Sequence, residues 1–344
     1  MAWAAAIAGC SPDSLLDFSA SINPLGPPES VVQAMNEALG QLRHYPDPGY
    51  THLRRALGQY HQVPADWVLP GNGAAELLTW AARDIAAVGD CHLLTPAFGD
   101  YERALAAFDV PILPWPLALD EVDTPANPWP EPQAASILIN NPHNPTGCLF
   151  DVASLEPLLE RFATVVVDEA FMDFVRPEQQ QSLIRHLERY PNLVVLRSLT
   201  KFYTLPGLRI GYALGHPDRL GRWQRWRDPW PVNSLAAAAA IAAVGDTAFQ
   251  ARTWQWLPAA RQALFEGLRA IPGLSPMAGA ANYLLIKTTT PAPRLQERLL
   301  RSHQVLIRDC LSFAELGPDY LRVAVRTQVE NDCLLTALRQ ELAV

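Results

Sequence analysis

The chain has 344 residues, of which 49% are hydrophobic and 18% charged, and its mean hydropathy is +0.01. This composition is typical of a globular protein with a sizeable core and excludes disorder as the main state. The net charge of −8 includes no basic block, which argues against a nucleic-acid partner. The longest apolar run, Leu235 to Val244, is far shorter than the roughly 20 residues that span a bilayer, so we expect no membrane partner.

The cysteine pattern indicates a reducing compartment. Five cysteines are an odd number, and none has the spacing of a zinc site or a disulfide framework. We therefore expect a cytoplasmic protein without a metal site. The first ten residues end in Cys10 and superficially resemble a lipoprotein signal, but they lack a positively charged start, so we expect no export.

Between about residues 66 and 215, short apolar runs alternate with amphipathic stretches, the pattern of parallel strands joined by crossover helices. The apolar runs predict strands over Cys91–Leu94, Val110–Leu113, Ser136–Ile139, Thr164–Val167, Leu193–Arg197 and Arg209–Leu214. Helical spacing predicts helices over Ala74–Ala86, Gly99–Ala107, Ser154–Phe162, with Ser154 as N-cap, and Gln181–Glu188. This part is therefore predicted to be an α/β domain with a mainly parallel sheet.

The pattern changes after Pro229-Trp-Pro231 to a long alanine-rich helical segment from Ser234. Further elements are predicted at Tyr283–Ile286, Pro293–Arg301, Val305–Ile307, Leu321–Val325 and from Val329 onward. The first 45 residues are too proline-rich for a core element and are expected to pack on this second, α+β part. The predicted division is an arm over 1–45, a large domain over 46–232 and a small domain over 233–344.

The residues around Lys201 give the first indication of a chemical function. Among 27 basic residues, only Lys201 and Lys287 are lysine, and a guanidinium cannot replace an amine in Schiff-base chemistry. Lys201 follows a predicted strand, with Ser198 and Thr200 before it and Arg209 after it. This arrangement can place an amine beside an anion-binding cluster. The alternative is a surface lysine in a loop.

Asp168 stands at the carboxyl end of a wholly apolar predicted strand, where open parallel sheets bind ligands. A buried carboxylate needs a cationic partner to stay ionised. A protonated pyridine nitrogen would serve, and so would a structural arginine.

Two further segments follow or precede predicted elements. Asn140-Asn-Pro-His-Asn-Pro-Thr-Gly147 offers amide side chains on a loop stiffened by proline, although alone it is a plain turn. Free backbone N–H groups at Gly73, Ala74 and Ala75 could hold a phosphate at the start of a helix. An ordinary helix N-terminus is the alternative.

Four short motifs and an arginine follow one another along the chain, in the order Gly-Asn-Gly, Asn-Pro-Thr-Gly, Asp-Glu-Ala, Ser-x-x-Lys and Arg. As a set they resemble the fold-type I pyridoxal-phosphate enzymes of the class I/II aminotransferase superfamily, over essentially the whole chain. The resemblance implies an α/β fold with a seven-stranded, mainly parallel sheet in the large domain and a smaller α+β domain. It also implies pyridoxal 5′-phosphate as cofactor, with Lys201 as the Schiff-base residue.

The resemblance assigns further roles around that cofactor. Asp168 would pair with the pyridinium nitrogen, Asn144 would donate to the ring hydroxyl oxygen, and Phe98 would stack on the ring. The cofactor phosphate would be held by the side chains of Ser198, Thr200 and Arg209 and the backbone of Gly73, Ala74 and Ala75.

Tyr45 resembles the tyrosine that reaches the phosphate from a neighbouring subunit, which implies a homodimer; a buried core tyrosine is the alternative. Two positions depart from the family pattern. Phe171 replaces a tyrosine whose hydroxyl often donates to the ring oxygen, and Ala74 and Ala75 replace side chains that often contact the phosphate.

The cofactor can stabilise the carbanion left by loss of either the α-proton or the α-carboxylate, so the fold does not choose the reaction. Arg322 matches the arginine that binds the substrate carboxylate. Arg308, on a nearby predicted strand, could hold a substrate phosphate together with Asn23. Each arginine could equally form a structural ion pair.

Four segments, at 16–27, 229–233, 307–313 and 322–327, resemble the subgroup that decarboxylates L-threonine O-3-phosphate in cobalamin biosynthesis. The implied products are (R)-1-amino-2-propanol O-2-phosphate and carbon dioxide. One alternative is the aminotransferase subgroup acting on histidinol phosphate. Another is a non-catalytic module that binds pyridoxal phosphate or an effector. Serine phosphate also stays open as a substrate, since one methyl group is worth only about 1–3 kcal/mol of discrimination.

Overall fold

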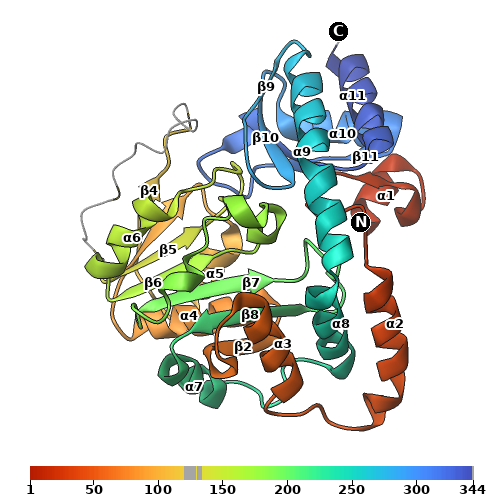
Figure 1. Ribbon diagram of the computed structural model, residues 1–344. Coiled ribbons are helices and arrows are strands. Elements are labelled where there is room, and N and C mark those ends of the chain that lie inside the picture. The colour runs from red at the N-terminus through yellow and green to blue at the C-terminus, as the bar shows by residue number, and fades with distance from the viewer. Residues whose placement is uncertain (120–128, 130–133, 343–344) are drawn as a thin grey trace.

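The computed structural model describes residues 1–119, 129 and 134–342. Its largest sheet has, within these residues, seven strands in the order β2-β8-β7-β6-β5-β3-β4 (Figure 1). Strand β8 runs antiparallel to β2 and β7, and the other neighbouring pairs are parallel. The strands are β2 Val68–Asn72, β3 Cys91–Thr95, β4 Ile112–Pro116, β5 Ser136–Asn140, β6 Thr164–Asp168, β7 Leu193–Ser198 and β8 Ile210–Gly215. The expected seven-stranded, mainly parallel sheet is confirmed.

Helices cover both faces of this sheet, which explains why its central strands are apolar at nearly every position. One face, with Val166 and Leu196, packs on α4 Ala74–Ala86, α5 Gly99–Ala106 and α7 Pro217–Trp226. The other face, with Val167 and Val195, packs on α3 Thr51–His61, α6 Val152–Arg161 and α8 Ser234–Gly245. Side chains along each strand alternate between the two cores.

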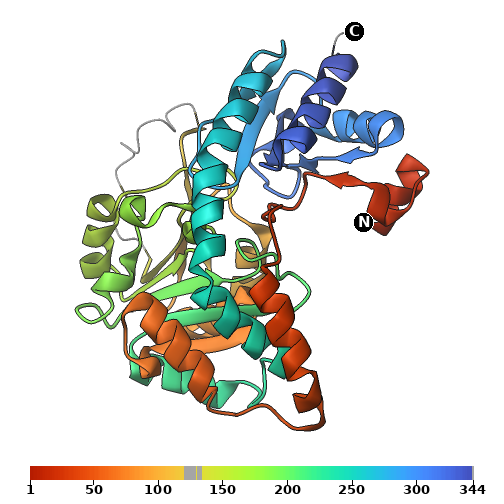
Figure 2. The ribbon, with the colours of Figure 1, turned by 45° about the vertical axis from the view of Figure 1, so that its right-hand side comes forward.

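A smaller antiparallel sheet has the order β12-β13-β10-β9. The long helix α9 Thr247–Arg269 runs from the large sheet to this smaller one (Figure 2). The elements here are β9 Leu274–Pro276, β10 Tyr283–Thr288, α10 Ala292–His303, β11 Val305–Leu306, β12 Arg308–Asp309, β13 Tyr320–Ala324 and α11 Gln328–Leu342.

The N-terminal segment contacts distant parts of the chain. Strand β1 Leu16–Asp17 pairs in parallel with β11, helix α1 Ala2–Ala8 packs on α10, and helix α2 Glu29–Ala38 packs on α8. The short 3-10 turns are η1 Pro12–Ser14, η2 Leu39–Arg43, η3 Ala65–Trp67, η5 Met172–Phe174, η6 Pro177–Gln179, η7 Leu183–His186 and η8 Gly317–Asp319. The three-part domain division stays a prediction.

Three predictions about single elements were wrong by more than a one-residue shift at an end. Asp151, not Ser154, caps α6, because its carboxylate accepts from the Ser154 N–H at 2.6 Å. The strand predicted over Val110–Leu113 begins two residues later, at Ile112. The helix predicted over Gln181–Glu188 is only the 3-10 turn η7, which Ser182 caps.

The proline-rich first 45 residues do contain helices, because Pro28 stands at the N-cap of α2 and not in its interior. No single described helix has the length and apolar composition of a membrane span. Only the bent pair α8 and α9, which meet at 67°, satisfies both criteria together.

Candidate active site

The candidate site lies where the central strands of the large sheet end. Asn140, Asp168 and Ser198 are the last residues of the neighbouring strands β5, β6 and β7. Because the carboxyl ends of parallel strands meet at one edge, their side chains gather there. The N-terminus of α4, which follows β2, opens on the same edge.

Asp168 is buried and has no cationic partner among the described ion pairs. Its carboxylate accepts hydrogen bonds from the Tyr101 hydroxyl at 2.8 Å and the Ala170 N–H at 2.9 Å. Burial raises the pKa of Asp168, and these two hydrogen bonds oppose the rise. The structural-arginine alternative therefore has no support in the described chain. The site fits a ligand that brings its own positive charge, as a protonated pyridine does.

Lys201 lies just beyond the end of β7, partly buried and close to other cations. Burial, then Arg322 and Arg209, lower the pKa of Lys201 to about 8, while Asp17 opposes them. Lys201 lies in a turn, but it is not a fully exposed surface lysine. A lysine with this pKa has a larger neutral, nucleophilic fraction near pH 7 than an ordinary one.

The first turn of α4 forms a cradle of backbone N–H groups beside an arginine. Gly73, at its N-cap, has φ +77°, and no side chain caps the helix. The prediction that the Gly73 N–H is free for a phosphate was wrong, because it donates to the Gly71 carbonyl oxygen at 2.8 Å. A Cβ at Gly73 would lie 2.5 Å from a guanidinium nitrogen of Arg209, so this arginine lies directly against the turn. Arg209 itself has φ +57°, a strained conformation for a side-chain-bearing residue. The N–H groups of Ala74 and Ala75 thus face the same place as a guanidinium, which suits a phosphate.

Ser198 and Thr200 flank this cradle on the lysine side. Both are buried, and the Thr200 N–H donates to the Ser198 hydroxyl oxygen at 3.3 Å. Either hydroxyl has its proton free of any hydrogen bond described here, so both can donate to an anion.

Arg322 is a buried arginine without an ion pair among the described residues. Its guanidinium donates to the Asn144 side-chain oxygen and, at 3.2 Å, to the Ser19 carbonyl oxygen, and lies 5.0 Å from the centre of the Tyr283 ring. Its Nε has no hydrogen-bond partner. The structural ion pair considered for Arg322 is absent from the described contacts. Because the Asn144 oxygen is occupied, the Asn144 amide nitrogen is left as the donor.

Arg308 lies directly across from Arg322. The register of β12 and β13 pairs the two residues, which places both side chains on one face of the small sheet. Arg308 donates to the Ser312 hydroxyl at 2.7 Å and forms no ion pair among the described residues. Two guanidinium groups without carboxylate partners therefore share one face.

The two predicted aromatic contacts differ. Phe98 is 43% exposed and meets the Tyr101 ring edge-on at 5.7 Å, so it lies beside the residue whose hydroxyl binds Asp168. Tyr45 is 80% exposed and stacks on Trp230 at 4.5 Å. The buried-core alternative for Tyr45 is wrong, and nothing described brings its hydroxyl to the site of its own chain.

Asn23 was predicted as a substrate ligand, and the structure corrects this. Its amide nitrogen donates to the Phe202 carbonyl at 2.9 Å and to the Thr253 hydroxyl at 3.0 Å, so both amide hydrogens are used inside the protein. Its backbone N–H donates to the Lys201 carbonyl oxygen at 3.0 Å. Asn23 therefore holds the lysine loop in place and has no donor left for a substrate.

Sequence reasoning missed three contacts in the site. Tyr101 reaches Asp168 because it follows Phe98 by one helical turn, a spacing that could have been noticed. Asn140 accepts from the Asn144 N–H at 2.5 Å. Gly147 and Gly279 touch through their backbones, since a Cβ at Gly147 would lie 3.1 Å from the Gly279 Cα. Nothing in the sequence pairs these two glycines.

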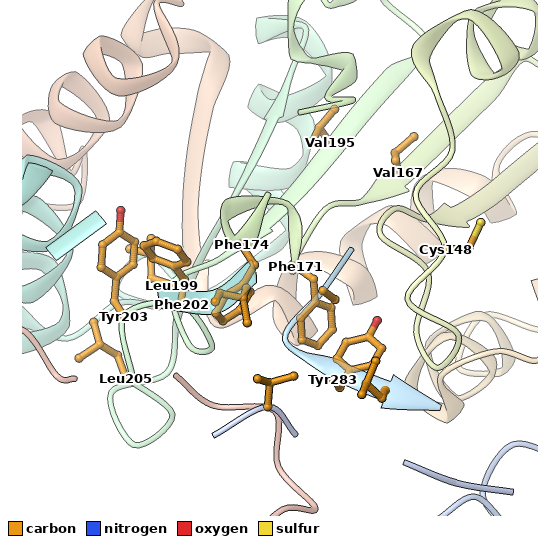
Figure 3. Close-up of a cluster of buried hydrophobic side chains, with 14 of the residues drawn as sticks. Cys148, Val167, Phe171, Phe174, Val195, Leu199, Phe202, Tyr203, Leu205 and Tyr283 are labelled. Atoms are coloured by element: carbon orange, nitrogen blue, oxygen red, sulfur yellow. The ribbon is translucent and has the colours of Figure 1, made fainter. Parts of the chain in front are cut away.

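A cluster of buried aromatic side chains, which includes Phe171 and Tyr283, lies beside the loop that carries His143 and Asn144 (Figure 3). Phe171 meets the Tyr283 ring edge-on at 4.9 Å, and the Tyr283 hydroxyl donates to the His143 carbonyl at 2.8 Å. Phe171 has no hydroxyl to offer a ligand, and that of Tyr283 is engaged by the backbone. The cluster excludes water beside the loop that carries Asn144.

Residues 13–338 match the family described as aminotransferase class I and II. A threonine-phosphate decarboxylase of Salmonella typhimurium is 40% identical, over 98% of this chain and 94% of its own. A histidinol-phosphate aminotransferase of Symbiobacterium thermophilum is 34% identical, over 95% of this chain and 91% of its own. Among solved structures, the chain is similar to the crystal structure of the histidinol-phosphate aminotransferase of Sinorhizobium meliloti with pyridoxal 5′-phosphate. The TM-score is 0.87 and the sequence identity 22%, and the match covers 99% of this chain and 94% of the other.

Proposed function

The chain belongs to the aminotransferase class I and II family, and from that premise we propose that it is a pyridoxal-phosphate enzyme that decarboxylates L-threonine O-3-phosphate. The products are (R)-1-amino-2-propanol O-2-phosphate and carbon dioxide, for cobalamin biosynthesis. The threonine-phosphate decarboxylase that is 40% identical supports this choice of reaction.

The observation that carries the proposal is the pair formed by Arg308 and Arg322. They face each other across β12 and β13, and their hydrogen-bond partners among the described residues are Ser312, Asn144 and Ser19, none of them a carboxylate. A substrate with a carboxylate and a phosphate offers one anion to each guanidinium, by charge-assisted hydrogen bonds. In this assignment Arg322 holds the carboxylate and Arg308 the phosphate.

The residues at the sheet edge fit the cofactor. Pyridoxal phosphate, when bound, supplies an electron sink for the α-carbon of the substrate. Asp168 would keep a proton on its ring nitrogen, Asn144 would donate to its ring oxygen, and Phe98 would cover the ring. Its phosphate would be held by Ser198, Thr200, Arg209 and the N–H groups of Ala74 and Ala75, because the Gly73 N–H already donates to the Gly71 carbonyl oxygen at 2.8 Å.

The remaining work falls to orientation and proton transfer. Arg322 fixes the direction of the substrate carboxylate, and Arg308 fixes the other end of the molecule, so that one bond to the α-carbon is aligned for cleavage. Lys201 would hold the cofactor covalently until the substrate amine binds, which would leave the lysine amine free. With its pKa lowered to about 8, it can then return a proton to the α-carbon after carbon dioxide leaves.

Carbon dioxide release from L-threonine O-3-phosphate by the purified holoenzyme tests the proposal, with glutamate as comparison substrate. We expect one carbon dioxide per substrate and no change in the cofactor. The second candidate, histidinol-phosphate aminotransferase, is favoured by the 34% identical relative. It predicts instead that glutamate converts the cofactor to pyridoxamine phosphate without carbon dioxide release.

A K201A variant separates an enzyme from a binding module. Turnover should fall by a factor of about 10⁴ or more, because no other described amine can replace that of Lys201. A module that only binds the cofactor or an effector would keep its function.

We also propose a homodimer in the cytoplasm. Tyr45 and Trp230 form an exposed aromatic pair, with Leu39 and Leu42 exposed nearby in sequence. In a dimer Tyr45 would reach the cofactor phosphate of the neighbouring subunit. The odd number of cysteines without disulfide spacing supports the compartment. The division at residues 45 and 232 is part of the same proposal.

A further inference from the structure

A buried ion cluster lies behind the active site, on the opposite face of the sheet. Arg197 is 1% exposed, and its two terminal nitrogens contact different carboxylates: Glu169 at 3.0 Å and Asp173 at 2.6 Å. The Glu169 carboxylate also accepts from the Ser182 hydroxyl at 2.8 Å and the Leu183 N–H at 2.9 Å. None of these side chains has a part in the mechanism above.

The cluster is joined directly to two cofactor-binding positions. Glu169 follows Asp168 at the end of β6, and Arg197 precedes Ser198 at the end of β7. Neighbouring residues of a strand point to opposite faces, so Asp168 and Ser198 face the site while Glu169 and Arg197 face away. Figure 3 shows Val167 and Val195, two residues earlier on each strand, and by the same alternation they share a face with Glu169 and Arg197.

The backbone completes the connection, since the Glu169 N–H donates to the Leu196 carbonyl oxygen at 2.8 Å. The Glu169–Arg197 contact therefore ties the tips of β6 and β7 together just where they carry the two ends of the cofactor site. Asp173, held to the same guanidinium, anchors the pair to the turn η5.

Stability alone gives a weak reason for such a cluster. Desolvation of buried charges offsets most of their attraction, and apolar residues of similar volume often stabilise a core as well or better. Burial raises the pKa of Glu169 and of Asp173, and the Arg197 charge opposes both shifts. An arrangement with two carboxylates on one guanidinium instead gives a fixed, forked geometry.

We propose that Arg197 is a positioning residue that, with Glu169, fixes the separation between Asp168 and Ser198. The cofactor is a rigid ring whose nitrogen and phosphate must reach both ends at once, so a small shift between the strand tips weakens its binding. This inference rests on the proposed function only in requiring that the protein bind pyridoxal phosphate.

An R197K variant tests the proposal, since lysine keeps the charge but cannot bridge two carboxylates with a planar fork. The measurement is cofactor dissociation from the holoenzyme, followed by its absorbance, together with the pH midpoint of that absorbance. We expect dissociation to be about tenfold easier or more, with a shifted midpoint. E169Q, which keeps the side-chain shape and leaves Arg197 paired with Asp173, should change both in the same direction.

R219K is the matched control. Arg219 contacts Asp84 at 2.6 Å on the other side of the sheet, away from the strand tips. We expect it to lower the thermal unfolding midpoint without changing cofactor dissociation or the absorbance midpoint.

The proposal is overturned if R197K and E169Q retain the cofactor as the wild type does, whatever their thermal stability. If R197K does not fold, E169Q alone decides by the same two readouts. It is also overturned if the wild type binds no pyridoxal phosphate. A wild type that binds the cofactor but releases no carbon dioxide would contradict the decarboxylase proposal and leave this comparison decisive.

Discussion

The amine of Lys201 is held in a place that favours its chemistry and disfavours its charge. Burial and two nearby guanidinium groups lower its pKa from about 10.5 to about 8. A charged group in such a place destabilises the folded chain until a ligand compensates it. The free energy of unfolding of the cofactor-free protein should therefore depend on this one side chain.

We predict that a K201M variant, without cofactor, is more stable than the wild type at pH 7, by on the order of 1–3 kcal/mol. The folded-state pKa is below the unfolded value, so the unfolded chain binds more protons between about pH 8 and 10.5. Wild-type stability accordingly rises relative to the variant across this range, and the gap should close. Denaturant unfolding at pH 7 and pH 10 measures it; a constant gap would show that the lysine charge is not the cause.

The two substrate arginines should be separable by the anion that each holds. R322K should lower kcat/KM for threonine phosphate by about tenfold or more, because lysine loses the forked contact with a carboxylate. It should weaken competitive inhibition by L-threonine equally. R308K should lower kcat/KM for threonine phosphate but leave inhibition by L-threonine, which has no phosphate, unchanged. Equal effects of R308K on both ligands would contradict the assignment of the phosphate to Arg308.

At the scale of single elements, the turn from β2 into α4 combines a glycine with a helix N-terminus. Arg209, which precedes β8 and has a positive φ, packs against this turn. Gly73 has a positive φ and lies against the Arg209 guanidinium. The turn thus brings the helix N–H groups and the arginine to one place without any capping side chain. Its geometry depends on the missing Cβ of Gly73.

A G73A variant should therefore weaken cofactor binding by about tenfold or more and lower stability by about 1–3 kcal/mol, because the methyl group displaces Arg209 and strains the turn. Cofactor titration and thermal unfolding measure the two effects. G245A is the control: a Cβ there meets no atom within 4 Å, so both values should stay near those of the wild type.

Elements were predictable from the sequence where local chemistry decides them. The apolar run ending at Asp168 predicted β6 and its polar tip, and the Gly-Asn-Gly turn predicted the start of α4. Asp151 displaced Ser154 as a cap because two good caps stand within one turn. The contact between Tyr101 and Asp168 depends on which helix covers which strand. The hydrogen bond from the Asn23 side chain to the Phe202 carbonyl depends on a segment about 180 residues away. Neither is encoded locally.

At the scale of the whole molecule, the N-terminal segment links parts that are far apart in the chain. Its strand β1 pairs with β11, Asn23 binds the loop after β7, and α2 packs on α8. The same segment leads into the exposed surface that carries Leu42 and Tyr45. Assembly and cofactor binding are thus expected to depend on each other.

An L42R variant should convert the proposed dimer into monomers, because it places a charge on a side chain that is 59% exposed in the single chain. Since Tyr45 would then lose its neighbour, cofactor dissociation should become easier by several-fold. Sedimentation velocity and absorbance measure the two quantities. Y45F, which leaves Leu42 intact, should weaken cofactor binding without changing the sedimentation coefficient. A monomeric wild type would remove the basis for both expectations.

The backbone contact between Gly147 and Gly279 limits how this sequence can vary. A Cβ at Gly279 would lie 3.0 Å from the Gly147 Cα, and Ala280 donates to the Gly147 carbonyl at 2.7 Å. When a side chain in a core grows, a neighbour can usually shrink to make room. Here both residues are glycine and neither has a side chain that could become smaller. A change at one position therefore cannot be compensated by a change at the other. In a library randomised at both codons, functional clones should return glycine at each.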